Sequence, residues 1–226
     1  MRSKMHLPPS VEAQLQTSLQ AQTDLTKANP RLEQALERVK ERDLPPISVS
    51  PSFGRLLSIL CKFVKAQSVL EIGTLGGYST IWLAESMPGI KVTSIEFDPK
   101  HKEVAEQNTK GMDNIDIRLG AALDVLPQLQ GEGAQFDLIL IDADWPNQHR
   151  YFDWAVRLAK KGACIYVDNV VWKITRSQSQ GNPEARALIE QIKSDERVEA
   201  TLIPTLSNYD TDTRALVDGI VIAWVR

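Results

Sequence analysis

Acidic and amide side chains follow two short apolar runs of the sequence, at the points where each run stops. Asp142 and Asp144 end the run at residues 138–141, and Asp168 with Asn169 end the next run. Neighbouring parallel strands would bring Asp142, Asp168 and Asn169 into one cluster of oxygen atoms. Such hard oxygen ligands, without histidine or cysteine, suit Mg²⁺, which keeps open positions for water or substrate. The pattern predicts a magnesium site, although Asp142 and Asn169 could instead cap the segments that follow.

A glycine-rich segment, E-I-G-T-L-G-G-Y-S at residues 71–79, follows the first apolar run of the alternating region. Its glycines let a ligand approach the backbone closely, and the helix that follows favours an electron-rich group. The spacing differs from the G-x-G-x-x-G dinucleotide fingerprint. Glu96 ends the next strand, where an acid suits hydrogen bonds to two ribose hydroxyls. Each feature alone could be a tight turn or a solvated acid, but together they favour a nucleoside-bearing cofactor. Small residues at 120–122 would let a flat ring lie against the backbone.

Two tryptophans follow the fourth and fifth predicted strands. Trp145 and Trp172 are expected either to pack in the core or to form a wall against the substrate. His101 lies between two lysines and is expected to be solvated, and a surface position is favoured for His149. The two cysteines of the chain are too few for a disulfide scaffold and predict buried thiols in a reducing compartment.

Short apolar strands and amphipathic helices alternate over most of the chain and must position these groups. Strands are predicted at residues 69–72, 91–96, 115–119, 136–141, 163–167, 198–203 and 219–225. Helices are predicted at residues 52–64, 79–85, 123–129 and 147–159, and after the caps Asp98-Pro99 and Asn182-Pro183. This order predicts an α/β fold with a mostly parallel sheet covered on both faces. The last two strands have no helix between them and should pair antiparallel at an edge.

Two further helices are predicted before this region, at residues 10–28 and 30–42, with thin apolar stripes. Residues 1–45 are therefore expected to form a helical appendage whose stripes need a partner surface. Residues 46–226 are expected to form the main domain.

Composition excludes several classes of protein. The 226 residues carry 26 basic and 29 acidic side chains, a net charge of −3 that argues against nucleic acid and anionic membranes as partners. The apolar runs fall far short of the ~20 residues that span a bilayer. The start of the chain lacks a secretory signal, although Arg2 and Lys4 give a faint hint of a mitochondrial presequence. We expect a soluble intracellular protein, cytoplasmic or alternatively mitochondrial.

The motifs, in order, resemble the cation-dependent O-methyltransferases of the catechol and caffeoyl-CoA O-methyltransferase family. The matching residues are 71–79, Ile95-Glu96, Ile141-Asp142-Ala143-Asp144 and Asp168-Asn169. The resemblance runs from about residue 49 to the C-terminus. It implies the Rossmann-like class I methyltransferase fold, with strand order 3-2-1-4-5-7-6 and an antiparallel strand 7. It also implies S-adenosylmethionine, a divalent cation such as Mg²⁺, a homodimer, and a role for residues 1–45 as a lid or a dimer contact.

The resemblance assigns roles residue by residue. The metal ligands would be Asp142, Asp168 and Asn169. The cofactor-binding set would be Glu71, Gly73, Thr74, Gly77, Ser79, Glu96, Phe97, Ala121, Ala122 and Asp142. Within that set, the methionine part would lie beside Glu71 and Gly73, its carboxylate on Ser79, the ribose on Glu96, and the adenine on Ala121 and Ala122.

Two departures from the family pattern concern the acceptor. Family members carry a lysine, taken as the general base, where this chain has Trp145, which cannot accept a proton. Either the metal activates the hydroxyl alone, with Asp142 in the catalytic centre, or Lys173 substitutes as base; a solvated loop position for Lys173 is favoured slightly. Residues 206–217 form an insertion expected near the substrate mouth or a subunit contact.

The sequence therefore predicts an O-methyltransferase that methylates one of two adjacent hydroxyls on a small catechol-like or polyphenolic acceptor, such as a flavonoid or caffeoyl compound. Three alternatives stay open. They are a homologue that binds S-adenosylmethionine without catalysis, a nicotinamide oxidoreductase, and a methyltransferase acting on protein or RNA, although the acidic balance weighs against RNA.

Overall fold

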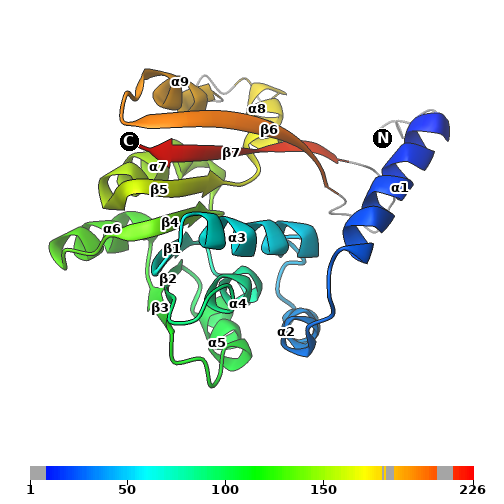
Figure 1. Ribbon diagram of the computed structural model, residues 1–226, viewed down its shortest axis with the longest axis horizontal. Coiled ribbons are helices and arrows are strands. Elements are labelled where there is room, and N and C mark those ends of the chain that lie inside the picture. Colours follow the sequence, from blue (N-terminus) through cyan, green and yellow to red (C-terminus); the bar gives the residue numbers. More distant parts are fainter. Residues whose placement is uncertain (1–8, 180, 182–185, 208–215) are drawn as a thin grey trace.

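A seven-stranded sheet in the order β3-β2-β1-β4-β5-β7-β6 forms the centre of the molecule (Figure 1). The computed structural model describes residues 9–179, 181, 186–207 and 216–226. The strands are β1 (Ser68–Ile72), β2 (Lys91–Glu96), β3 (Ile115–Leu119), β4 (Phe136–Ile141), β5 (Ala159–Val167), β6 (Val198–Ser207) and β7 (Leu216–Val225). The first five strands are parallel, and β7 is antiparallel to both β5 and β6. The predicted fold class and strand order are confirmed.

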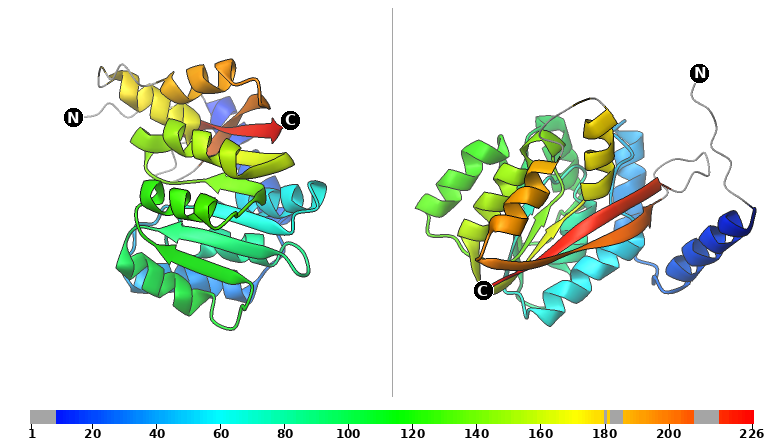
Figure 2. Two further views of the ribbon diagram at one scale, coloured as in Figure 1. Left: turned by 90° about the vertical axis from the view of Figure 1, so that its left-hand side faces the viewer. Right: turned by 90° about the horizontal axis from the view of Figure 1, so that it is seen from above.

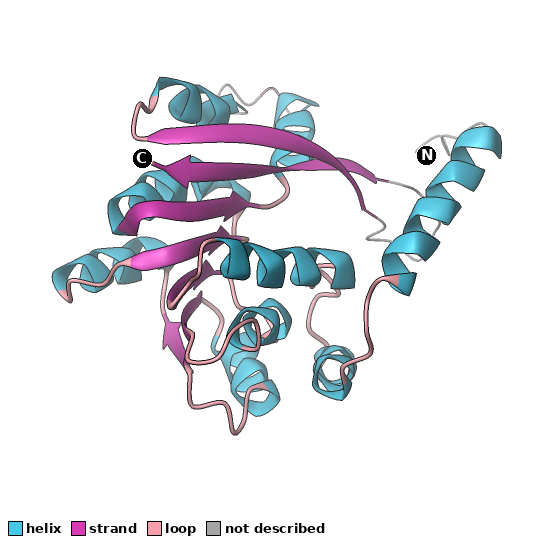
Figure 3. Ribbon diagram, in the orientation of Figure 1, coloured by secondary structure: helices cyan, strands magenta, loops and turns pink. Residues whose placement is uncertain are grey.

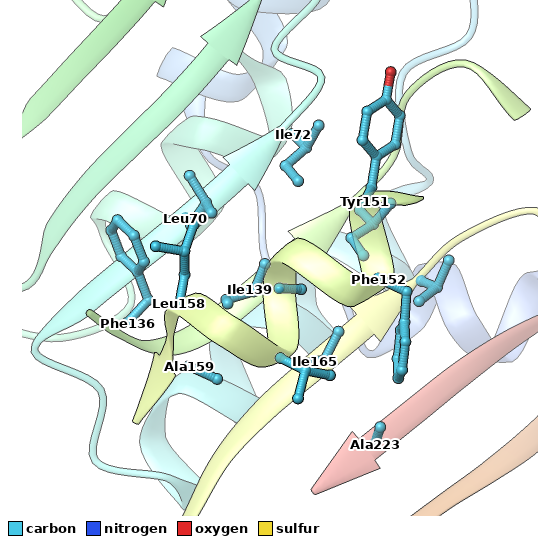
Figure 4. Close-up of a cluster of buried hydrophobic side chains, with 14 of the residues drawn as sticks. Leu70, Ile72, Phe136, Ile139, Tyr151, Phe152, Leu158, Ala159, Ile165 and Ala223 are labelled. Atoms are coloured by element: carbon cyan, nitrogen blue, oxygen red, sulfur yellow. The ribbon is translucent and has the colours of Figure 1, made fainter. Parts of the chain in front are cut away.

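Helices cover both faces of the sheet, as the alternation of short apolar strands predicts (Figures 2 and 3). They are α1 (Pro9–Asp24), α2 (Pro30–Glu41), α3 (Pro51–Phe63), α4 (Tyr78–Ala84), α5 (Pro99–Asn108), α6 (Ala122–Gly131), α7 (Gln148–Leu158), α8 (Val170–Ser179) and α9 (Ala187–Ser194). A short 3₁₀ turn, Trp145–Asn147, precedes α7. Leu70 and Ile139 pack with α6, α7 and α9 on one face, whereas Val69 and Leu138 pack with α3 and α4 on the other. Figure 4 shows the first cluster, with the Tyr151 hydroxyl directed away from it.

The strand register brings the functional segments level with one another. Ile72 pairs with both Ile95 and Ile141, and Ile141 pairs with Val167. The ladder continues for one residue beyond these strands. The N–H of Asp142 donates to the Ile72 carbonyl at 2.9 Å, and the N–H of Asp168 donates to the Ile141 carbonyl at 3.0 Å. The predicted oxygen ligands therefore follow adjacent strands at the same level, at the carboxyl ends of the parallel strands.

The two N-terminal helices differ in their packing. Asn29 caps α2 by accepting the N–H groups of Arg31 and Leu32, as the Asn-Pro pair predicts. The buried stripe of α2 packs against α3, α4 and α5, so this helix is continuous with the core. In contrast, α1 projects from the body (Figure 2), and among its described side chains Leu15 is buried.

Two segments differ from the sequence-based expectation. The segment after Asn169 was expected to be a loop, but it forms α8, which packs on β7. The predicted helix start at Asn182-Pro183 lies outside the described residues. The predicted insertion at 206–217 begins and ends as strand, because residue 207 pairs with residue 216; its middle, residues 208–215, lies outside the described part. In the described part of the chain, every helix is too short or too polar to cross a membrane.

Candidate functional site

A cavity of about 880 Å³ lies beyond the carboxyl ends of the parallel strands. Its lining includes Glu96, Ala121, Asp142, Trp145, Asn169 and Asp218. A second cavity of about 50 Å³ adjoins it and shares Ile47, Gly73, Leu75 and Asp142 with it. The position agrees with the general placement of ligand sites in open α/β sheets.

Gly73 holds the turn between β1 and α4 in a conformation that a side chain would disrupt. Its φ is +105°, and a Cβ atom there would lie 2.0 Å from the carbonyl oxygen of Asp142. The next residues turn their N–H groups toward Glu96, whose Oε2 accepts from Thr74 at 3.2 Å and from Leu75 at 2.7 Å. Gly73 lines both cavities, and Thr74 and Ser79 line the smaller one.

Glu71 lies beneath this turn and lines neither cavity. Its carboxylate is fully buried and accepts hydrogen bonds from the hydroxyls of Thr80 and Ser94. Burial raises the pKa of Glu71 to about 7, against the lowering effect of these hydroxyls. Gly77, likewise absent from both linings, starts α4 at φ +79° against Ala105. Glu71 and Gly77 therefore stabilise the turn between β1 and α4 without lining either cavity.

The part of the main cavity formed by the residues that follow β2 and β3 is lined by mostly small, apolar side chains. Phe97, Ala121 and Ala122 line it, and Phe97 is 75% exposed. His101 also lines it, with Nδ1 3.5 Å from Oε1 of Glu96. The prediction that His101 is solvated is therefore wrong. Because Asp98 caps α5, His101 falls in the first helical turn and faces back toward the end of β2.

Three carboxylates gather on the opposite side: Asp142 and Asp218 line the cavity, and Asp168 lies behind them, buried. Burial, followed by the charges of Glu71 and Asp218, raises the pKa of Asp142 to about 7. Burial and the charge of Asp142 raise the pKa of Asp168 well above its usual range. Asp168 Oδ1 accepts the N–H of Asn169, while Oδ2 is buried with no hydrogen-bond partner among the described residues.

The described residues contain no cluster of three or more histidine, cysteine, aspartate or glutamate side chains that could hold a metal ion. The predicted ligand set instead combines two carboxylates, Asp142 and Asp168, with the amide of Asn169. Asn169 adopts a left-handed conformation, φ +55°, which asparagine tolerates better than most residues. A hard cation is the group that such oxygen donors could hold.

Asp218, at the start of the buried part of β7, is a site residue that the sequence did not reveal. It is 3% exposed. Its Oδ2 accepts from Nδ2 of Asn169 at 2.9 Å, and its Oδ1 accepts from the N–H of Trp172 at 2.9 Å. In the sequence, the available signal was an acid before a glycine at the start of an apolar strand. Its hydrogen-bond partners follow from the pairing of β7 with β5.

Trp145 and Trp172 form an aromatic pair in the wall of the main cavity. Their ring centroids are 4.1 Å apart and their planes meet at 65°, an edge-to-face contact. Asp144, which precedes Trp145, accepts a hydrogen bond from the Tyr151 hydroxyl. Both residues of that hydrogen bond also line the cavity.

Lys173 is not the solvated loop residue that was favoured. It lies in the first turn of α8, its N–H donates to the Asn169 carbonyl at 3.2 Å, and it is 4% exposed. Among the described residues that line the main cavity, Lys173 is absent. Since α8 begins directly after Asn169, this side chain turns into the protein. His149, for which a surface position was favoured, is half-buried in α7.

The fold and the arrangement of this site are those of the class I methyltransferases. A family model described as O-methyltransferase matches residues 22–209, so the chain belongs to the O-methyltransferase family. The expected resemblance and enzyme class are confirmed, and the nicotinamide oxidoreductase alternative is excluded.

Individual relatives agree with this assignment. Catechol O-methyltransferase of Mycobacterium tuberculosis is 38% identical, with 97% of this chain and 96% of that protein covered. The O-methyltransferase from Bacillus cereus, solved in complex with SAH, gives a TM-score of 0.83 at 36% identity, covering 92% of this chain and 96% of that one. An O-methyltransferase of Streptomyces achromogenes involved in tomaymycin synthesis, solved with SAM, gives 0.82 at 34% identity, covering 93% and 96%.

Proposed function

We propose that this O-methyltransferase transfers the methyl group of S-adenosylmethionine to one of two adjacent hydroxyls on a small catechol-like or polyphenolic acceptor, with the help of a divalent cation. The observation that carries the proposal is one cavity lined by Asp142, Asn169 and an aromatic wall, with the buried carboxylate of Asp168 directly beside Asn169. Relatives solved with SAM or SAH, and one named catechol O-methyltransferase, support it.

The cofactor would occupy the side of the cavity formed after β1, β2 and β3. Glu96 would accept the ribose hydroxyls, and Ala121 with Ala122 would give the adenine a flat surface beside Phe97. Thr74 and Ser79 would bind the amino acid end in the smaller cavity. The sulfonium would then lie near Asp142, where the carboxylates favour a positive charge.

The cation would be held by Asp142, Asp168 and Asn169. The buried Oδ2 of Asp168, unpartnered among the described residues, fits this role because a buried carboxylate oxygen requires a donor or a cation. When bound, a divalent cation acts as a Lewis acid and lowers the pKa of a coordinated hydroxyl toward neutral pH.

The chain's own residues would orient the acceptor. The faces of Trp145 and Trp172 would hold the aromatic ring, so that the attacking oxygen points at the methyl group. Because the leaving thioether is neutral, it requires no general acid. Trp145 cannot accept the acceptor proton, and Lys173 is buried away from the lining, so we propose that water takes the proton.

A methylation screen tests this function. Phenols with one hydroxyl and with two adjacent hydroxyls are incubated with labelled S-adenosylmethionine and Mg²⁺, with and without EDTA. We expect label transfer to adjacent diols alone, with loss of transfer in EDTA. Transfer that persists in excess EDTA would remove the cation from the mechanism.

The substitution of Trp145 for the family's lysine favours a second candidate, a homologue that binds the cofactor without catalysis. Cofactor binding by calorimetry together with no turnover, across all metals and phenols tested, would establish this second reading.

A further inference from the structure

We propose that Trp145 makes the acceptor site select uncharged or cationic aromatic acceptors and reject those that carry a carboxylate. The inference deepens the proposed function, on which it rests, by assigning the charge class of the acceptor. Three features carry it: the excess of acidic over basic side chains in the cavity lining, the position of the Asp144 carboxylate, and the aromatic pair.

The ionisable groups around the main cavity are mostly acidic. Glu96, Asp142, Asp144 and Asp218 line it, and Asp168 borders the same cluster. The lining drawn from the described residues contains no lysine or arginine, and its one imidazole, His101, lies beside Glu96 on the cofactor side. Even with a divalent cation and a sulfonium bound, this lining would offer a further anion acidic side chains and no lysine or arginine among the described residues.

The Asp144 carboxylate lies beside the aromatic pair, and both of its oxygens accept hydrogen bonds. One of its oxygens accepts from the Tyr151 hydroxyl, and the other accepts from Nδ2 of Asn147 at 2.7 Å. The Asp144 carboxylate is therefore held in place next to Trp145 by two donors.

The rings of Trp145 and Trp172 also favour neutral or cationic acceptors over anionic ones. The face of an indole carries negative charge density and attracts an ammonium group, and it also stacks on a neutral ring. In the family pattern a lysine stands at position 145 and would provide a cation near the acceptor. Trp145 removes that cation and substitutes a surface that repels a carboxylate.

Three acceptors that share the catechol ring test the inference: 4-ethylcatechol, which is neutral, dopamine, which is cationic, and 3-(3,4-dihydroxyphenyl)propionate, which is anionic. The expected kcat/KM of the anion is at least tenfold below that of the neutral acceptor, and that of the cation is equal to or above it. Equal values for the anion and the neutral acceptor would overturn the proposal.

Two variants of position 145 separate charge from shape. Trp145→Lys should raise the kcat/KM of the anion relative to the neutral acceptor by tenfold or more. Trp145→Phe, which keeps an aromatic and uncharged side chain, should preserve the order of the three acceptors. If Trp145→Lys leaves the ratio unchanged, position 145 does not determine selectivity and the proposal fails.

Binding without turnover distinguishes this inference from the proposed function. With SAH and Mg²⁺ present, no methyl group can be transferred, and calorimetry gives the dissociation constant of each of the three ligands. A tenfold weaker constant for the anion supports the selectivity even if the chain methylates no phenol, a result that would count against the function alone. Equal constants, or no binding of any of the three, would overturn the selectivity.

Discussion

Asp168 places a carboxylate oxygen inside the protein with no hydrogen-bond partner among the described residues. Asp168→Asn should abolish cation-dependent methyl transfer and the calorimetric signal of Mg²⁺ binding, because one charged ligand is lost. The melting temperature should hold or rise, since an unpartnered buried carboxylate costs stability. The exposed Asp124→Asn is the matched control and should change neither measurement. Normal turnover in Asp168→Asn would remove this residue from the ligand set.

Glu96 already accepts the N–H groups of Thr74 and Leu75, which fixes its carboxylate at the end of β2. Hydrogen bonds to a charged group contribute about 1.5–3 kcal/mol each, so Glu96→Ala should weaken cofactor binding by at least about tenfold. Glu106→Ala, on the exposed face of α5, should leave the dissociation constant unchanged in the same calorimetric titration. An unchanged constant in Glu96→Ala would show that the ribose lies elsewhere.

Glu71 predicts a pH dependence of stability. Its pKa is about 7 in the folded protein against the ordinary glutamate value of 4.5, so the folded state binds the proton more tightly. Stability should therefore fall as pH rises from about 4.5 to about 7, by roughly 3 kcal/mol at 1.36 kcal/mol per unit. Urea denaturation of the wild type and of Glu71→Gln at pH 5 and pH 8 measures this. The variant should lose less stability over that interval, and an identical loss would contradict the assignment.

At the scale of elements, α2 packs directly on the glycine turn. A Cβ atom on Gly76 would lie 2.2 Å from Cγ2 of Val39, and Nδ2 of Asn108 donates to the Gly76 carbonyl at 2.7 Å. Gly76→Ala should destabilise the protein by about 1–3 kcal/mol through overpacking. The double variant with Val39→Ala should be less destabilised than the sum of the two single variants, because the clash is removed. Additive changes in urea denaturation would show that the helix and the turn are independent.

The sequence predicted the elements with strong local signals. Apolar runs that stop at Glu96, Asp142 and Asp168 gave three strands and the residues at their ends, because burial and side-chain type are both readable there. It missed α8, since Asp168-Asn169 resembles the start of a loop and the Asn-Pro pair further on is a stronger helix start. It also missed Asp218, whose hydrogen bonds to residues about fifty positions away depend on the entry of β7 beside β5. Long-range pairing of this kind leaves no local signal.

At the scale of the whole molecule, α1 stands away from the body and exposes Leu25 to 82% just beyond its end (Figure 2). A helix that projects in this way offers a surface that a second subunit could cover. We expect a homodimer in which this helix contributes to the contact. Light scattering after gel filtration should give about twice the chain mass of 25.2 kDa, and removal of residues 1–27 should shift it toward one chain mass. A single chain mass at micromolar concentration for the intact protein would refute the expected dimer.

The position of β7 also sets an order of events during synthesis. In the described sheet, β7 lies between β5 and β6 and follows all six other strands in the chain. The strand that carries Asp218 thus leaves the ribosome after those six strands, whereas the turns after β1, β2 and β3 emerge much earlier. A nascent chain would acquire its nucleoside pocket well before its acceptor pocket, and a cofactor bound at that stage would stabilise the partly folded domain until β7 arrives.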